Sequence, residues 1–119
     1  MSDSYDFGKI AEKIAVNFLL DKGYVILATN YFYQKAEIDI IAEKDEFICV
    51  IEVKARSYNS VQEPFEAVNL KKRKLLIKAA DFYLQNNNIN LEVRFDIISI
   101  VKNNQFQTIE HIENAFDIF

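Results

Sequence analysis

Hydrophobic residues recur at helical spacing near the start of the chain. Ile10, Ile14 and Phe18 repeat at intervals of four, with small or apolar residues in the turns between them. This spacing predicts a helix over about residues 7–22, with Asp6 as its candidate N-cap. A glycine follows directly, at the position where glycine commonly ends a helix.

A second helix is predicted over about residues 70–86. Asn69 is its candidate cap, because an asparagine side chain accepts a hydrogen bond from the free N–H groups of a first helical turn. Pro64 opens a turn before the cap, and the helix fades into an Asn-Asn-Asn run typical of a loop. The first turns of this helix carry the basic run Leu-Lys-Lys-Arg-Lys.

The remaining apolar segments are short and rich in β-branched residues, which is typical of strands. Strands are predicted over residues 24–29, 36–42, 47–55, 93–102 and 106–112. The last two would form a hairpin around an Asn-Asn-Gln turn, and a final turn is predicted at residues 113–116. The element order is therefore α-β-β-β-α-β-β. No repeat, linker or change of composition divides residues 1–119 into more than one domain.

Composition agrees with one globular α/β domain. Half of the 119 residues are hydrophobic and 27% are charged, so a core can form without disulfides or structural metals. No apolar run approaches the roughly 20 residues of a membrane helix, and the N-terminus lacks the features of a signal peptide. These features predict a cytoplasmic protein with no membrane partner. The net charge of −4 restricts any nucleic-acid contact to a local surface.

Charged residues interrupt two strands that are otherwise apolar. Glu37 and Asp39 lie in the second predicted strand, and Glu52 and Lys54 lie in the third. Alternate residues of a strand share a face, so the members of each pair lie on one side. If the four-residue loop Glu-Lys-Asp-Glu joins the two strands as a hairpin, Glu37 lies opposite Glu52 and Asp39 lies diagonal to it. All four charges then gather on one face.

Gathered carboxylates repel one another unless a positive charge lies between them. Lys54 supplies one such charge, and a divalent cation would supply more. Carboxylate oxygens favour Mg²⁺ or Mn²⁺. Glu12 of the first helix has small and apolar neighbours, so its side chain is expected to face the protein, where it can reach a metal site or pair with a lysine.

The alternative interpretation of Glu52 and Lys54 is an exposed ion pair at the end of a strand, which would contribute little to stability. The shared face, the upstream Asp39 and the apolar surroundings favour a functional site.

Several motifs of the chain occur together in one protein family. They are Glu12, AEID at 36–39, EVK at 52–54, FEAV at 65–68, AADFYL at 79–84, RFDII at 94–98 and HIENAF at 111–116. The set resembles the YraN-like family of bacterial proteins over nearly the whole chain. That family is assigned to the restriction-endonuclease-like superfamily, the PD-(D/E)xK nucleases, whose core is a mixed sheet of about five strands flanked by helices. The D-x₁₂-E-x-K spacing after a helix-borne glutamate is also similar to archaeal Holliday-junction resolvases.

The resemblance implies a site and a reaction. Asp39 and Glu52 would be metal ligands, Lys54 the catalytic lysine and Glu12 an accessory acid. The implied activity is Mg²⁺-dependent hydrolysis of DNA, with branched or structured DNA among the candidate substrates and a homodimer among the candidate assemblies. Two alternatives stand beside it: a non-catalytic nucleic-acid-binding or scaffold module of the same fold, and an internal ion-pair network that binds no metal.

Three basic residues of the second predicted helix are candidates for binding DNA. Lys71, Lys74 and Lys78 share an exposed face, and such a face can bind phosphates, although it can also be only solvated. His111, which has no evident partner in the sequence, is predicted to be structural rather than catalytic. Cys49 lies in an apolar run and is predicted to be a buried thiol without chemistry.

Overall fold

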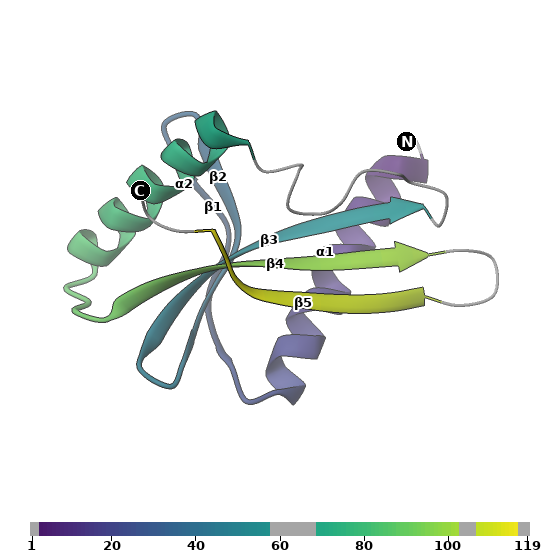
Figure 1. Cartoon of the computed structure of the whole chain (residues 1–119), viewed down its shortest axis with the longest axis horizontal. Coiled ribbons are helices and arrows are strands. Elements are labelled where there is room, and N and C mark those ends of the chain that lie inside the picture. Colours follow the sequence, from purple (N-terminus) through teal and green to yellow (C-terminus); the bar gives the residue numbers. More distant parts are fainter. Residues whose placement is uncertain (1–2, 58–68, 103–106, 117–119) are drawn as a thin grey trace.

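The computed structural model describes residues 3–57, 69–102 and 107–116 (Figure 1). In chain order the elements are α1 (Asp3–Asp21), β1 (Val25–Tyr33), β2 (Ala36–Lys44), β3 (Phe47–Ser57), α2 (Leu70–Asn86), β4 (Glu92–Lys102) and β5 (Gln107–Phe116). This order and the mixed five-stranded sheet confirm the predicted α/β fold class. Within the described ranges no helix is long and apolar enough to span a membrane.

The five strands form one sheet in the order β1-β2-β3-β4-β5. β3 and β4 run parallel, and the other neighbouring pairs are antiparallel. A parallel pair needs a crossover connection, and α2 lies in the chain between β3 and β4. The sheet is strongly twisted, so β1 and β2 run at a steep angle to β4 and β5 (Figure 1).

The two helices cover the sheet with separate hydrophobic cores. Ile48 and Val50 of β3 belong to the core beneath α2, whereas Cys49 and Ile51 belong to the core beneath α1. This alternation is the two-residue period of a strand that is covered on both faces. Cys49 is fully buried with a free thiol, as predicted.

The start of α1 differs from the prediction, whereas the start of α2 agrees with it. α1 begins at Asp3, so Asp6 lies inside the helix and its prediction as N-cap is wrong. An aspartate is favourable both at the cap and within the first turn, because both positions lie near the positive end of the helix dipole. Asn69 does cap α2, where its Oδ1 accepts the N–H of Lys72 at 2.9 Å. The turn predicted at Pro64 lies outside the described residues.

β1 and β5 both extend four residues beyond their predicted ends. β1 continues through the Tyr-Phe-Tyr run to Tyr33, because aromatic residues fit a pleated surface well. The turn predicted at residues 113–116 is wrong, since β5 continues to Phe116, which pairs with Phe95. The β4–β5 register shifts next to Phe95, and Asn114 has a φ of 52°. Such an irregularity lets polar residues continue a strand whose alternating pattern is broken.

The hairpin between β2 and β3 is tighter than the sequence indicated. Its turn has two residues, Asp45 and Glu46, whose φ values are 52° and 69°. Two successive positive φ angles are typical of a type I′ turn, which suits the twist of antiparallel strands. The predicted four-residue loop would have shifted the register by two residues, so the placement of Glu37 opposite Glu52 is wrong. The observed register pairs Ile40 with Ile51, so Asp39 and Glu52 are the next residues of the two strands beyond that pair.

Candidate active site

A hollow of about 480 Å³ contains all four site residues predicted from the sequence. Glu12 reaches it from α1, Asp39 from β2, and Glu52 and Lys54 from β3. Lys72, from the first turn of α2, also lines it. Residues far apart in the chain therefore converge at one point, which supports their prediction as one cluster.

Glu52 is the most buried charged group of this cluster. Only 3% of its side chain is exposed. Its Oε2 lies 2.9 Å from Nζ of Lys72 and 4.0 Å from Nζ of Lys54. Its Oε1 is buried and has no hydrogen-bond partner among the described residues. An unpaired buried carboxylate oxygen is costly, so the cluster favours a further positive or hydrogen-bonding group at this point.

Asp39 lines the same hollow as Glu52 and has a strongly perturbed pKa. Burial raises the pKa of Asp39 to about 7, and the negative charges of Glu52 and Glu12 act in the same direction. One opposing contribution comes from the backbone N–H of Val53, which donates to Oδ2 at 2.8 Å. The two carboxylates thus share a setting that disfavours two negative charges.

The two lysines respond differently to the same surroundings. Burial lowers the pKa of Lys54, and the neighbouring Lys72 ammonium lowers it further. Burial also acts to lower the pKa of Lys72, but the hydrogen bond and negative charge of Glu52 outweigh it, so the pKa of Lys72 is raised. Lys72 is therefore the firm ion-pair partner of Glu52, and Lys54 is the more loosely paired cation.

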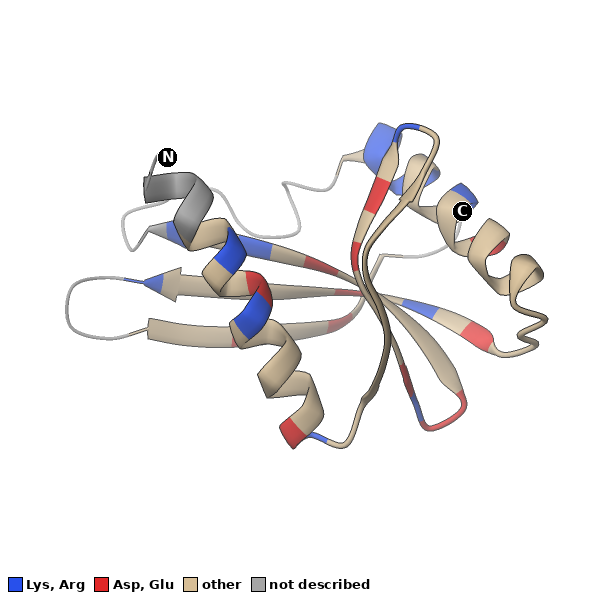
Figure 2. Ribbon diagram, turned by 180° about the vertical axis from the view of Figure 1, so that it is seen from behind, with Lys and Arg blue, Asp and Glu red and all other residues tan. Residues whose placement is uncertain are grey.

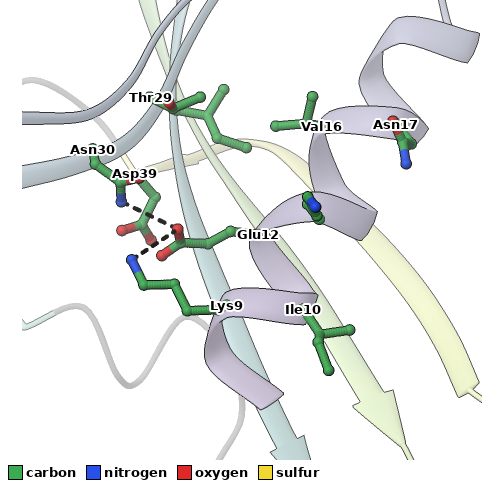
Figure 3. Close-up of a pocket in the computed structure, with 10 residues that line it drawn as sticks. Lys9, Ile10, Glu12, Val16, Asn17, Thr29, Asn30 and Asp39 are labelled. Carbon is green, nitrogen blue, oxygen red and sulfur yellow. Dashed lines mark hydrogen bonds and ion pairs between the residues drawn. The ribbon is translucent and has the colours of Figure 1, made fainter. Parts of the chain in front are cut away.

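Glu12 occupies the boundary between this hollow and a larger one of about 700 Å³, which runs along α1 (Figure 3). Its Oε1 accepts a hydrogen bond of 3.1 Å from Nδ2 of Asn30 and lies 4.0 Å from Nζ of Lys9. Asn30 also donates to Glu37, at 3.1 Å, and its φ of 50° lies in the left-handed region. Both open interpretations of Glu12 have support, since it reaches the site and also pairs weakly with a lysine.

Asp39 and Glu52 have the chemistry of ligands for a hard divalent cation. They offer carboxylate oxygens, they repel each other, and one buried oxygen of Glu52 has no hydrogen-bond partner in the part of the chain that the structure describes. No group of three or more His, Cys, Asp or Glu side chains that could hold a metal occurs within residues 3–57, 69–102 and 107–116. The protein would therefore supply two carboxylates, with water or substrate oxygens completing the shell, as is common for Mg²⁺.

The predicted DNA-binding lysines lie near the site but outside its core. Lys71, Lys74 and Lys78 lie on α2 at the surface of the protein. Lys71 lines a smaller hollow of about 310 Å³ together with Lys72 and Lys35. Figure 2 shows basic residues gathered at the first turns of α2 and along α1.

His111 has a partner that the sequence did not reveal. Its Nε2 lies 2.8 Å from Oδ2 of Asp96, a fully buried carboxylate on β4. Arg94 also binds both oxygens of Asp96, at distances between 2.9 and 3.2 Å. The expectation that His111 lacks a partner is wrong, and its place in this network agrees with a structural role.

Two residues of the site were missed in the sequence. Lys72 could have been found from helical spacing, because it lies four residues before Leu76, which is buried, and so shares the inward face of α2. Asn30 gave a weaker signal, since asparagine tolerates positive φ but also occurs in ordinary turns. Neither signal showed which carboxylate the side chain would meet.

Comparison with known proteins places the chain in a family. The model of a family described as "Uncharacterised protein family UPF0102" matches residues 11–100. A UPF0102 protein of Flavobacterium psychrophilum is 46% identical, over 98% of this chain and 98% of its own length. That of Christiangramia forsetii is 43% identical over the full length of both chains. One from Clostridioides difficile is 44% identical over 92% of this chain and 95% of its own. The matches confirm the YraN-like resemblance, and the chain belongs to the UPF0102 family.

Proposed function

We propose that this protein is a Mg²⁺-dependent DNA endonuclease that hydrolyses phosphodiester bonds at the hollow lined by Asp39, Glu52 and Lys54. The observation that carries the proposal is a hollow that holds a buried and a half-buried carboxylate with a lysine at its edge. The buried carboxylate has one oxygen without a hydrogen-bond partner among the described residues. A closed structural ion pair does not need an unsatisfied oxygen or a second acid with a raised pKa.

Each side chain has a role that follows from its position. Asp39 and Glu52 would hold Mg²⁺ or Mn²⁺, which supplies water activation and neutralises charge on the phosphate when bound. The Lys54 ammonium lies 4.0 Å from Glu52 and its side chain is 22% exposed, so it can meet a phosphate that enters the hollow. There it would stabilise the charge that develops in the transition state. Glu12 holds the Asn30 side chain, and through it the wall formed by β1.

The proposed substrate is held by a local basic surface. Lys71, Lys74 and Lys78 would bind backbone phosphates, because an acidic protein can hold a polyanion only where positive side chains gather. Phosphate contacts carry no sequence information, so the expected substrate is defined by structure, with branched DNA as a candidate. A homodimer would place two such sites on two strands.

A second candidate function is a nucleic-acid-binding or scaffold module that does not cut. One observation favours it: Lys72 already neutralises Glu52 at 2.9 Å, so the cluster has a counter-ion of its own. In that case the same surface would bind DNA without cutting it, whether or not a divalent cation is bound.

The deciding experiment combines metal binding with cleavage. Mn²⁺ binding is measured by calorimetry on the wild type and on the double variant Asp39→Asn, Glu52→Gln, and each protein is then incubated with linear, flapped and four-way DNA. The proposal expects wild-type binding and metal-dependent cleavage of at least one DNA, and neither from the double variant. Metal binding without cleavage of any DNA would favour the second candidate.

A further inference from the structure

Lys72 is the closest positive group to Glu52. Its Nζ lies 2.9 Å from Oε2 of Glu52, compared with 4.0 Å for Nζ of Lys54. The two partners differ in accessibility, because 3% of the Glu52 side chain is exposed and 37% of the Lys72 side chain is. The carboxylate is thus fixed inside the protein, whereas the lysine reaches it from the surface and can leave without disturbing the core.

The Lys72 side chain borders a second hollow, which its ammonium could occupy. It lines both the hollow of the candidate site and the adjoining hollow that it shares with Lys35 and Lys71. Its backbone is held in the first turn of α2, where its N–H donates to Oδ1 of Asn69. A fixed backbone with a long, half-exposed side chain allows the ammonium to move between the two hollows by rotamer changes alone.

A buried carboxylate needs a counter-ion. The Glu52 carboxylate does not need both the Lys72 ammonium and a divalent cation as counter-ions. Removing the partner of a buried charge is destabilising, so the ionised form of Glu52 favours a cation beside it. A divalent cation bound by Asp39 and Glu52 would supply that charge and would repel an ammonium in contact with the same carboxylate.

We propose that Lys72 is an exchangeable counter-ion of Glu52. It occupies the carboxylate in the metal-free protein, competes with the divalent cation for it, and is released toward Lys35 and Lys71 when the cation binds. The released ammonium is then available to a phosphate oxygen of the nucleic acid beside the site. This inference deepens the proposed function and rests on it, because it takes Glu52 to be a metal ligand.

Calorimetry with Mn²⁺ alone tests the competition. Lys72→Met removes the competing charge and keeps the length of the side chain, so Mn²⁺ affinity is expected to rise on the order of tenfold. Lys22→Met is the matched control, because it removes the same charge from a side chain that lies over the Phe18 ring, away from the site. Its Mn²⁺ affinity should equal that of the wild type.

Thermal melting gives a second readout that does not depend on activity. Without metal, Lys72→Met leaves the more distant Lys54 as the ion-pair partner of Glu52 within the described ranges, so the variant should melt below the wild type. Mn²⁺ replaces the missing charge, so it should raise the melting temperature of Lys72→Met by more than it raises that of the wild type. If Lys72→Met does not fold, Lys72→Gln keeps a hydrogen-bond donor for Glu52 and serves in both measurements.

The outcomes separate this inference from the proposed function. If wild type and both Lys72 variants bind Mn²⁺ with equal affinity, the exchange is refuted and the metal site stands. If only the Lys72 variants bind Mn²⁺, the competition is supported. If neither the wild type nor a folded Lys72 variant binds it, the metal site fails and the inference fails with it.

Discussion

Two buried carboxylates in neighbouring strands are held in opposite ways. Asp96 on β4 is fully buried, and both of its oxygens accept hydrogen bonds, from Arg94, His111 and the backbone N–H of Asn114. Glu52 on β3 is almost as buried, yet it has one close ion pair and one oxygen without a partner among the described residues. The first arrangement is complete by itself, whereas the second is not.

The pKa shifts at the two sites also differ in direction. Burial alone would raise the pKa of Asp96, but hydrogen bonds from His111 and Arg94 outweigh it, so the pKa of Asp96 lies below its ordinary value. Beside Glu52, the pKa of Asp39 is raised to about 7, by burial first and then by Glu52 itself. The comparison indicates that a buried acid with satisfied oxygens supports the fold, and that a crowded, unsatisfied pair is suited to binding a cation.

The largest expected effect is on stability, at the hydrogen-bonded network of Asp96, Arg94 and His111. Asp96→Asn should destabilise the protein by about 3–5 kcal/mol, because it leaves the largely buried Arg94 without its main counter-ion. Glu113→Gln is the matched control. It removes the other carboxylate on Arg94, at 3.0 Å, but this one is 59% exposed and should cost less than about 1 kcal/mol. Urea unfolding of both variants measures the difference, and equal losses would show that Asp96 is no more structural than a surface acid.

The second expected effect is on the cleavage rate at the candidate active site around Glu52. Lys54→Met removes the charge beside Glu52 and keeps the bulk of the side chain. The cleavage rate should fall by roughly 10²-fold, about 2.7 kcal/mol, which is typical when one preorganised electrostatic contact is deleted. Mn²⁺ binding should persist. Lys22→Met, which changes a side chain in the hollow next to His111, should cut like the wild type. A Lys54→Met protein that cuts at the wild-type rate would remove Lys54 from the mechanism.

A smaller effect is expected on DNA binding. Replacing Lys71, Lys74 and Lys78 with alanine should weaken DNA affinity, because fewer phosphates are then neutralised by the protein. The slope of log K against log salt should become shallower by about 0.9 for each phosphate that the variant no longer neutralises.

The control for that experiment replaces lysines near His111, away from the candidate active site. Lys22 and Lys44 line the hollow next to His111, so their double alanine variant should leave the slope unchanged. Fluorescence anisotropy at several salt concentrations measures both slopes. Equal slopes for all the proteins would place the DNA interface elsewhere.

The smallest effect concerns Asp39 and depends on pH. Its folded pKa of about 7 exceeds the ordinary value of 3.8, so its contribution to stability is complete below pH 4 and is lost as pH rises through 7. Asp39→Asn keeps an oxygen for the N–H of Val53 and cannot ionise. Without metal it should therefore melt at or above the wild type at pH 8, with the advantage shrinking toward pH 4.

Asp96 should behave in the opposite way. Its folded pKa is lowered, so its contribution is present at neutral pH and is lost only as pH falls below the ordinary range of a carboxyl group. Thermal melts of Asp39→Asn and wild type in EDTA, from pH 4 to pH 8, test the contrast. A variant that melts well below the wild type at pH 8 would mean that the Asp39 carboxylate is a structural partner.

Local patterns in the sequence determined the order of elements and pointed to four residues of the site. Helical spacing around Ile14, alternation in β3 and the capping asparagine Asn69 each act within a few residues, so they can be read directly from the chain. The charges at Asp39 and Glu52 were conspicuous for the same reason, because their neighbours are apolar.

Tertiary structure decided which charges meet. The two-residue turn after Lys44 set the register and paired Ile40 with Ile51, so Asp39, rather than Glu37, follows next to Glu52. A sequence indicates that a loop exists more reliably than it fixes the loop's length, and a change of two residues re-pairs every side chain along the hairpin.

The contrast between the complete and the incomplete carboxylate also depends on distant elements. Asp96 and Glu52 are both acids within apolar strands, and neither sequence segment shows which partners its carboxylate meets. What separates them is the docking of β5, which brings His111 to Asp96, and of α2, which brings Lys72 to one oxygen of Glu52. These interactions join residues far apart in the chain and depend on how helix and sheet pack, which only the folded structure fixes.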